Sequence, residues 1–207
     1  MKLYVTPGSP YARMARIVLI EKGLEKRVEV IFAQTRTAGS PYYQINPSGR
    51  VPYLLRDDGV GLEESALICA WFDQLDGKPI FGLPAGEAQW EARRLEGLAR
   101  SLLDGLSVWL RETYRPENER SPGVIRHEIE RARRLLDLWE REIAHPYMRG
   151  ALNMAQLTLA CALGLEARNP DFDWRSGHTR LRDWFAPIAA RPSFTVTAPP
   201  AAAKKSG

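Results

Sequence analysis

Hydrophobic and polar residues follow two different periods along the first 76 residues, which predicts a mixed α/β region. Short apolar or alternating runs, bounded by turn residues such as Asp-Asp-Gly at 57–59, predict strands. Segments in which apolar residues recur every three or four positions predict amphipathic helices. The predicted strands are 2–5, 27–32, 51–56 and 60–62, and the predicted helices are 10–23 and 64–75, with a short helix between the second and third strands.

Beyond residue 86 the chain keeps only the helical period. Apolar residues step by three and four between 95 and 109, and a second stripe runs from 125 to 143. A third helix is expected to begin at Asn153, where Gln156 completes a capping box, and its body is apolar nearly all round. A fourth stripe covers 181–188. Together these segments predict a helical bundle.

A segment rich in glycine and proline, GKPIFGLPAG, separates the two regions and is typical of a linker. The pattern therefore predicts an α/β domain followed by an all-α helical-bundle domain. The predicted boundaries are 1–76 for the α/β domain, 77–86 for the linker, 87–198 for the helical domain and 199–207 for a disordered tail.

The composition is that of an ordinary globular protein, with 207 residues of which 44% are hydrophobic and 26% charged. Two cysteines, Cys69 and Cys161, make no disulfide framework, and no Cys/His cluster predicts a metal site. No apolar run is long enough for a membrane span, and the start lacks the apolar core of a signal peptide, so we expect a cytoplasmic protein. The net charge of +4 is scattered along the chain, which disfavours nucleic-acid binding.

Three residues near the first helix and the third strand are candidates for binding a ligand. Ser9 is either a plain N-cap or a hydroxyl that, with the first helix amides, helps to hold a thiolate or a carboxylate. Pro52 opens a strand and is a candidate for a cis bond, which would turn the backbone groups of Val51 towards a ligand. The alternative is that 46–52 is a plain loop before a strand.

Three further candidates also have two interpretations. Glu64 and Ser65 suit a helix start, but a carboxylate and a hydroxyl beside free helix amides also suit the two charged groups of an amino-acid ligand. Arg50 is either a surface charge or a partner for a second ligand carboxylate. Each of these features, taken singly, is explained by an ordinary structural role such as capping a helix or forming a loop. Their occurrence together, in this order and before an all-helical region, favours a binding site.

The runs SPYARMARIVLIEKGL, NPSGRVPYL and ESALICAWF carry these candidates, and they resemble the soluble glutathione S-transferases. The second half is similar as well, through ALNMAQLTLACALG and ARPSFTVTAPP, so the resemblance extends to about residue 199. It implies a thioredoxin-like N-terminal domain, an all-helical C-terminal domain and a homodimer. The serine-proline-aromatic opening is most similar to that of serine-type bacterial transferases.

The resemblance also implies which residues bind glutathione. Val51, before the presumed cis-Pro52, would pair its backbone with the cysteinyl unit of the tripeptide. Glu64 and Ser65 would hold the γ-glutamyl end, and Arg50 would lie near the glycine carboxylate.

The implied activity is that of a glutathione transferase, which needs glutathione as co-substrate and no metal. Ser9 would hydrogen-bond the glutathione sulfur and stabilise the thiolate, and Tyr11 takes this role if the Ser9 hydroxyl points away. The thiolate would then be conjugated to small hydrophobic electrophiles. Trp109, Tyr114 and the segment near Phe194 are expected to line the electrophile pocket, although the first two also suit a protein core.

Two other functions stay open: a glutathione-dependent peroxidase or reductase, and a non-catalytic transferase-like binding or regulatory protein. The window 9–12 contains no cysteine, which disfavours disulfide exchange. Arg100 and Ser101 stand where some relatives place an acidic residue that reaches the partner subunit's glutathione. The resemblance therefore leaves open whether a residue of the partner subunit completes the site.

Overall fold

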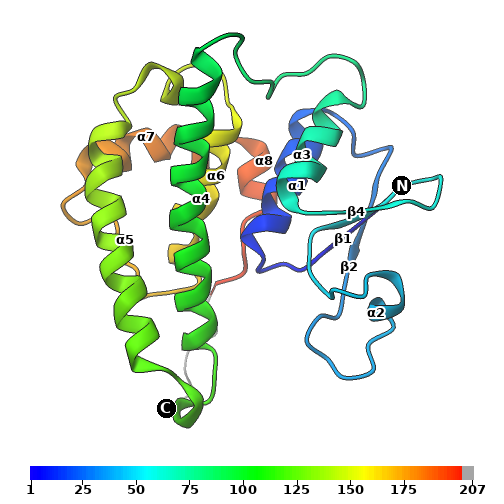
Figure 1. Cartoon of the computed structure of the whole chain (residues 1–207), viewed down its shortest axis with the longest axis horizontal. Helices are drawn as coiled ribbons and strands as arrows, with labels where there is room; N and C mark the ends of the chain where they lie inside the picture. Colours follow the sequence, from blue (N-terminus) through cyan, green and yellow to red (C-terminus); the bar gives the residue numbers. More distant parts are fainter. Residues whose placement is uncertain (202–207) are drawn as a thin grey trace. The chain divides into compact units, whose positions relative to one another are not determined.

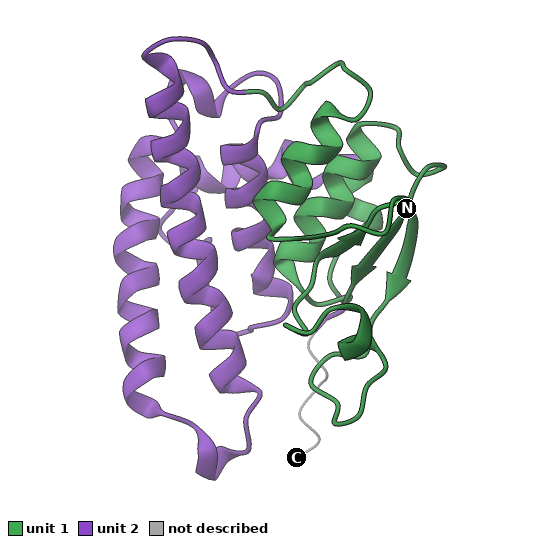
Figure 2. Cartoon of the chain, turned by 45° about the vertical axis from the view of Figure 1, so that its right-hand side comes forward, with its two compact units in different colours: residues 1–82, 192–199 green, residues 83–191, 200–207 purple. Residues whose placement is uncertain are grey.

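The structure is a computed structural model that describes residues 1–201 (Figure 1). The chain divides into two compact units (Figure 2). The first comprises Met1–Gly82 together with Pro192–Pro199, and the second comprises Leu83–Arg191. Of the predicted tail at 199–207, residues 202–207 lie outside the described residues.

The first unit is built on a four-stranded mixed sheet with the strand order β2-β1-β3-β4. β1 pairs in parallel with β2, and β3 pairs antiparallel with both β1 and β4. The strands are β1 (Lys2–Val5), β2 (Glu29–Phe32), β3 (Tyr53–Leu55) and β4 (Gly61–Glu63). The parallel pair needs a crossover, and the first helix supplies it.

Three helices of the first unit follow the strands in the predicted order. They are α1 (Pro10–Glu21), the single turn α2 (Tyr42–Ile45) and α3 (Ser65–Gln74). α1 and α3 lie side by side (Figures 1 and 2), and both contact the sheet. α1 is buried on more than one face because it packs against the sheet, α3 and a fourth helix. The sheet and its helices confirm the predicted thioredoxin-like fold.

The fourth helix of this unit, α8 (Pro192–Val196), comes from the far end of the chain. Its Phe194 side chain is almost fully buried, and α8 packs against α1. The predicted helical domain ran to residue 198, whereas the structure groups Pro192–Pro199 with the first unit. The physical reason is that the apolar face of α8 is buried on α1.

The second unit is all-helical, as predicted. Its helices are α4 (Ala88–Thr113), α5 (Pro122–Glu142), α6 (Met154–Leu163) and α7 (Thr179–Ala189), with short 3-10 turns at Glu117–Glu119, Pro146–Met148 and Gly164–Ala167. α6 is the buried helix that the all-round apolar pattern predicts. The predicted capping box is present, because the Asn153 side chain accepts from the Gln156 amide at 3.1 Å and the Gln156 side chain accepts from the Asn153 amide at 3.2 Å.

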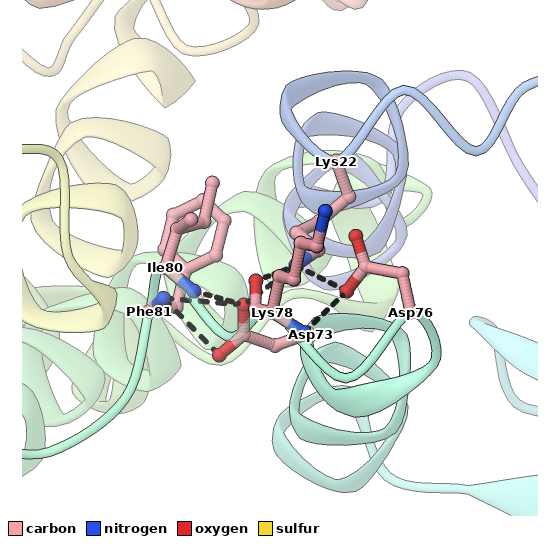
Figure 3. Close-up of polar contacts among 6 residues, drawn as sticks. All are labelled: Lys22, Asp73, Asp76, Lys78, Ile80 and Phe81. Carbon is pink, nitrogen blue, oxygen red and sulfur yellow. Dashed lines mark hydrogen bonds and ion pairs between the residues drawn. The ribbon is translucent and has the colours of Figure 1, made fainter.

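A buried ion pair joins the ends of α1 and α3 (Figure 3). The Lys22 ammonium lies 3.6 Å from an Asp73 carboxylate oxygen, and the two side chains are only 2% and 4% exposed. Lys22 also donates to Asp76 at 2.8 Å and to the backbone carbonyl of Lys78. The hydrogen bond from Lys22 holds the pKa of the Asp76 carboxyl below its usual value. One ammonium therefore links α1, α3 and the segment that follows α3.

The predicted linker at 77–86 is held down at its start by Asp73. This carboxylate accepts hydrogen bonds from the backbone amides of Ile80 at 2.8 Å and Phe81 at 3.1 and 3.2 Å (Figure 3). Phe81 is buried, so the chain leaves the first unit from a fixed position.

We expect Asp73→Ala to destabilise the chain by about 3 kcal/mol, because it leaves a buried ammonium and two amides short of their partner. Asp76→Ala is the matched control: it removes a carboxylate on the same ammonium but leaves the buried pair intact, so its effect should be smaller. Urea unfolding of both variants measures the difference. Equal losses of stability in the two variants would mean that the buried ion pair contributes no more than the contact with Asp76.

α4 contains two glycines in different surroundings. A Cβ added at Gly105 would lie 2.7 Å from a carboxylate oxygen of Glu128 and 3.2 Å from Cδ of Arg131, whereas a Cβ at Gly97 would meet nothing within 4 Å. Glu128 belongs to α5 and is buried. Gly105 therefore permits the close approach of α5 to α4.

Gly97→Ala should raise the free energy of unfolding by up to about 1 kcal/mol, because alanine is the better helix former. Gly105→Ala makes the same exchange in the same helix, but it should lower the stability because the methyl group displaces Glu128. Thermal melting of the two variants tests this opposition. A gain from both would contradict the described contact between α4 and α5.

Candidate functional site

Three strand ends meet at one edge of the sheet. The register sets Tyr53, at the start of β3, opposite Tyr4 near the end of β1 and opposite Glu63 at the end of β4. The chain therefore leaves β1, enters β3 and leaves β4 at the same edge. α1 begins a few residues after β1, and α3 begins directly after β4.

The segments at this edge carry the residues that the sequence singled out. Ser9 lies between β1 and α1, Val51 lies just before β3, and Glu64 with Ser65 lies between β4 and the body of α3. Sheet register thus brings four residues, dispersed over more than fifty positions, to one edge.

Ser9 is the N-cap of α1. Its backbone is extended, its side-chain oxygen accepts a hydrogen bond from the Ala12 amide at 3.2 Å, and Pro10 occupies the first helical position. A serine hydroxyl that accepts a hydrogen bond still carries a proton that it can donate. The first turn of α1 contains no acidic residue, so no protein carboxylate within it competes for the positive end of the helix dipole. Tyr11 lies two residues further along and is half-buried.

The segment before β3 is held in place by side chains that the sequence analysis did not single out. Asn46 caps a tight turn by accepting from the Ser48 amide at 3.2 Å, and Ser48 donates to the Glu63 carboxylate at 2.8 Å. The phenol of Tyr42 and the Asn46 side chain both donate to the Arg50 carbonyl, at 2.5 and 3.0 Å. The Asn-Pro-Ser-Gly string is itself a turn signal that would have identified this anchor.

These anchors position Val51 and Arg50. The Val51–Pro52 bond is cis, as the sequence predicts. Within residues 1–201, none of the hydrogen bonds described for this loop uses the backbone of Val51. The Arg50 side chain is exposed, and its position alone assigns it no ligand.

Glu64 has an unusual backbone conformation, with φ +85° and ψ 121°. A non-glycine residue at such a φ is strained by about 1–3 kcal/mol, and strain of this kind concentrates at functional sites. Glu64 is exposed, and the buried Ser65 hydroxyl donates to its carboxylate at 3.1 Å. The N-cap residue Glu64 makes no side-chain cap hydrogen bond to α3, and the positive end of this helix dipole favours an anion.

The edge therefore offers a hydroxyl donor at one helix N-terminus, a carboxylate and a hydroxyl at a second, and backbone groups between them. This set matches a peptide-like ligand that carries an anionic group, an ammonium and an α-carboxylate. Among the described residues, no group of three or more His, Cys, Asp or Glu side chains could hold a metal ion. None of the described helices is both long and apolar enough to cross a membrane.

The residues expected to line an electrophile pocket have different surroundings. Phe194 is 1% exposed and lies under the guanidinium of Arg13, so it is a core residue of the first unit and not a pocket wall. Tyr114 is half-exposed, and its hydroxyl donates to the Arg168 carbonyl at 3.2 Å. Trp109 is buried edge-on against the ring of Phe172.

Trp109 nevertheless lines a cavity that lies entirely within the helical unit. Its volume is about 500 Å3, and Ile125, Ile129, Leu136 and Phe172 form much of its apolar wall. Trp109 lines this cavity, whereas Tyr114 is not among its lining residues.

Comparison with known proteins identifies the family. Residues 8–75 match the glutathione S-transferase N-terminal domain, and residues 115–186 match the C-terminal domain. A glutathione transferase family member from Pseudomonas fluorescens Pf-5, solved with bound glutathione, is 32% identical over 96% of this chain and 98% of its own, with a TM-score of 0.84. The chain belongs to the glutathione S-transferase family.

Two further relatives of this transferase-family chain cover nearly its whole length. A Pseudomonas fluorescens Pf-5 family member solved with S-(propanoic acid)-glutathione is 32% identical over 97% of this chain and 100% of its own, with a TM-score of 0.82. An uncharacterised GST-like protein of Escherichia coli (strain K12) is 29% identical over 98% of this chain and 100% of its own.

The strain at Glu64 gives a test that is independent of any ligand. Glu64→Gly and Glu64→Ala both remove the carboxylate, but only glycine adopts φ +85° without penalty. We expect the glycine variant to be more stable than the alanine variant by about 1 kcal/mol, measured by urea unfolding. Equal stabilities would contradict the described backbone at this position.

Proposed function

We propose that this protein is a glutathione transferase that conjugates the glutathione thiolate to small hydrophobic electrophiles. The observation that carries the proposal is the position of Ser9. Its hydroxyl and the N-terminus of α1 stand at the same sheet edge as Val51, Glu64 and Ser65. Glutathione requires just such a combination, because it is a tripeptide with a thiol between two charged ends.

The sulfur is the group that Ser9 acts on. A free thiol has a pKa of about 8.5 and is mostly protonated at neutral pH. A hydroxyl donor and a helix N-terminus both stabilise the thiolate in preference to the thiol, which lowers the pKa of the bound thiol. The thiolate then forms a sulfur–carbon bond with the electrophile, and the electron pair of the broken bond leaves with the displaced group. Ser9 forms no covalent bond in this scheme.

The other candidates would hold the ends of the tripeptide. The Val51 backbone, not used by the described loop hydrogen bonds, pairs with the cysteinyl unit. The Glu64 carboxylate binds the γ-glutamyl ammonium, while Ser65 and the first amides of α3 bind its carboxylate. Arg50 lies in the same loop as Val51, so its exposed guanidinium is assigned to the glycine carboxylate.

Support for chemistry at the sulfur comes from the Pseudomonas fluorescens relatives. One was solved with glutathione and one with S-(propanoic acid)-glutathione, in which the sulfur is bonded to a carbon chain. By extension, we assign this chain the same tripeptide and conjugation at the same atom. The protein is proposed to act as a homodimer in the cytoplasm, where glutathione and other thiols are kept reduced.

Calorimetric titration with glutathione, followed by the ultraviolet thiolate absorbance of the complex against pH, tests the proposal. Binding with a thiol pKa clearly below that of free glutathione is the expected result. Binding without such a shift would favour a non-catalytic binding protein, and no binding would remove the assigned site. Turnover of hydroperoxides or disulfides, with no conjugation, would favour a peroxidase or reductase.

Ser9→Ala should lower kcat by about tenfold to a hundredfold and change glutathione affinity much less, because the hydrogen bond strengthens when the sulfur ionises. Tyr11→Phe is the matched control, since it removes the other hydroxyl near the start of α1. Steady-state kinetics with an aryl halide, together with calorimetry, separate the two parameters. A large effect of Tyr11→Phe and none of Ser9→Ala would transfer the role to Tyr11.

A further inference from the structure

α1 carries a buried guanidinium group, that of Arg13, to which the proposed binding of glutathione assigns no role. Arg13 is 8% exposed, and its guanidinium donates to the Phe194 carbonyl at 2.9 Å and, more weakly, to the Thr197 hydroxyl at 3.4 Å. It also lies 5.3 Å from the centre of the Phe194 ring. All three contacts are made with the chain segment that contains α8, and all are with neutral groups.

No counter-ion balances this cation within residues 1–201, where no carboxylate lies within 4.0 Å of Arg13. The described elements that pack most closely on α1 are α3, α8 and β1. α8 has no charged residue, β1 contributes only Lys2, and the one carboxylate of α3, Asp73, is paired with Lys22. On α1 itself, the Glu21 carboxylate accepts a hydrogen bond from Ser193.

A second arginine on the same helix adds to the positive potential. Arg16 donates to the Val196 carbonyl at 3.5 Å. Burial, and to a lesser extent the charge of the neighbouring Arg13 guanidinium, lowers the pKa of Arg16. A buried charge without a counter-ion is expensive to keep. Arg13 is such a charge, which suggests that an anion completes the arrangement.

The anion of the proposed reaction lies at the N-terminus of this helix. The Arg13 amide donates the first helical hydrogen bond to the Ser9 carbonyl at 2.9 Å, so Arg13 stands one turn from the N-cap. Side chains of an α-helix tilt towards its N-terminus. The charge of Arg13 therefore adds to the helix dipole at the position where the sulfur would ionise.

We propose that Arg13 stabilises the thiolate of bound glutathione electrostatically, from a distance and without touching the ligand. The α8 segment then has a definite role, since its carbonyl and hydroxyl hold the guanidinium in a dry environment where its field is weakly screened. The inference rests on the proposed function, because it needs glutathione sulfur at Ser9.

Arg13→Gln, with Arg13→Lys as the charge-conserving control, tests this directly. The readouts are the pKa of the bound glutathione thiol, from thiolate absorbance, and the pH profile of kcat/KM. Arg13→Gln should raise both apparent pKa values by about half a unit or more. Arg13→Lys should stay near the wild-type values. A folded Arg13→Gln protein with an unchanged thiol pKa would overturn the inference and leave Arg13 a purely structural role.

A surface variant keeps the test decisive if Arg13→Gln does not fold. Val196 is 64% exposed on α8, and its carbonyl accepts from Arg16. Val196→Glu adds a carboxylate that offsets the positive potential, whereas Val196→Gln adds the same bulk without charge. The glutamate variant should raise the thiol pKa relative to the glutamine variant, and identical values would contradict the inference.

The same measurements separate failure of this inference from failure of the proposed function. If the wild-type protein itself does not lower the thiol pKa of bound glutathione, the proposed function fails together with this inference. If the wild-type protein lowers that pKa but the variants do not change it, the inference alone fails.

Discussion

The pairing of β3 between β1 and β4 is the constraint on which the candidate site depends. This register fixes Tyr53 opposite both Tyr4 and Glu63, so three chain segments leave the sheet at one edge. Hydrogen bonds from Tyr42 and Asn46 then hold the loop that leads into β3. A slip of one residue in this register would turn every β3 side chain to the opposite face and separate the segments that the site requires.

Two features of the first unit, a strained backbone and a buried charge, lower its stability when the protein is considered alone. A bound ligand would give each of them a function. Glu64 holds a backbone conformation that favours glycine, and Arg13 is buried without a carboxylate partner among the described residues. Proteins keep such conflicts where function needs them and stabilise them through the surrounding fold. Here the stabilising parts are the packing of α8 on α1 and the buried pair of Lys22 and Asp73.

Much of this architecture could be predicted because it depends on local rules. Periodicity located the helices and strands, the Asn153 capping box marked the start of α6, and a proline at the start of a strand marked the cis bond at Pro52. The sequence could not show that α8 returns to the first unit, because the apolar residues of a short helix do not indicate which surface they will pack against. Nor could it show the left-handed backbone of Glu64, which no residue type there signals.

The central claim is that the N-terminus of α1, through Ser9, receives the sulfur of glutathione. A crystal structure of the protein with bound glutathione tests it most directly. The account predicts the sulfur within hydrogen-bond distance of the Ser9 hydroxyl, with the γ-glutamyl end at Glu64 and Ser65. A sulfur placed against the Tyr11 hydroxyl, or a tripeptide bound away from this sheet edge, would contradict it.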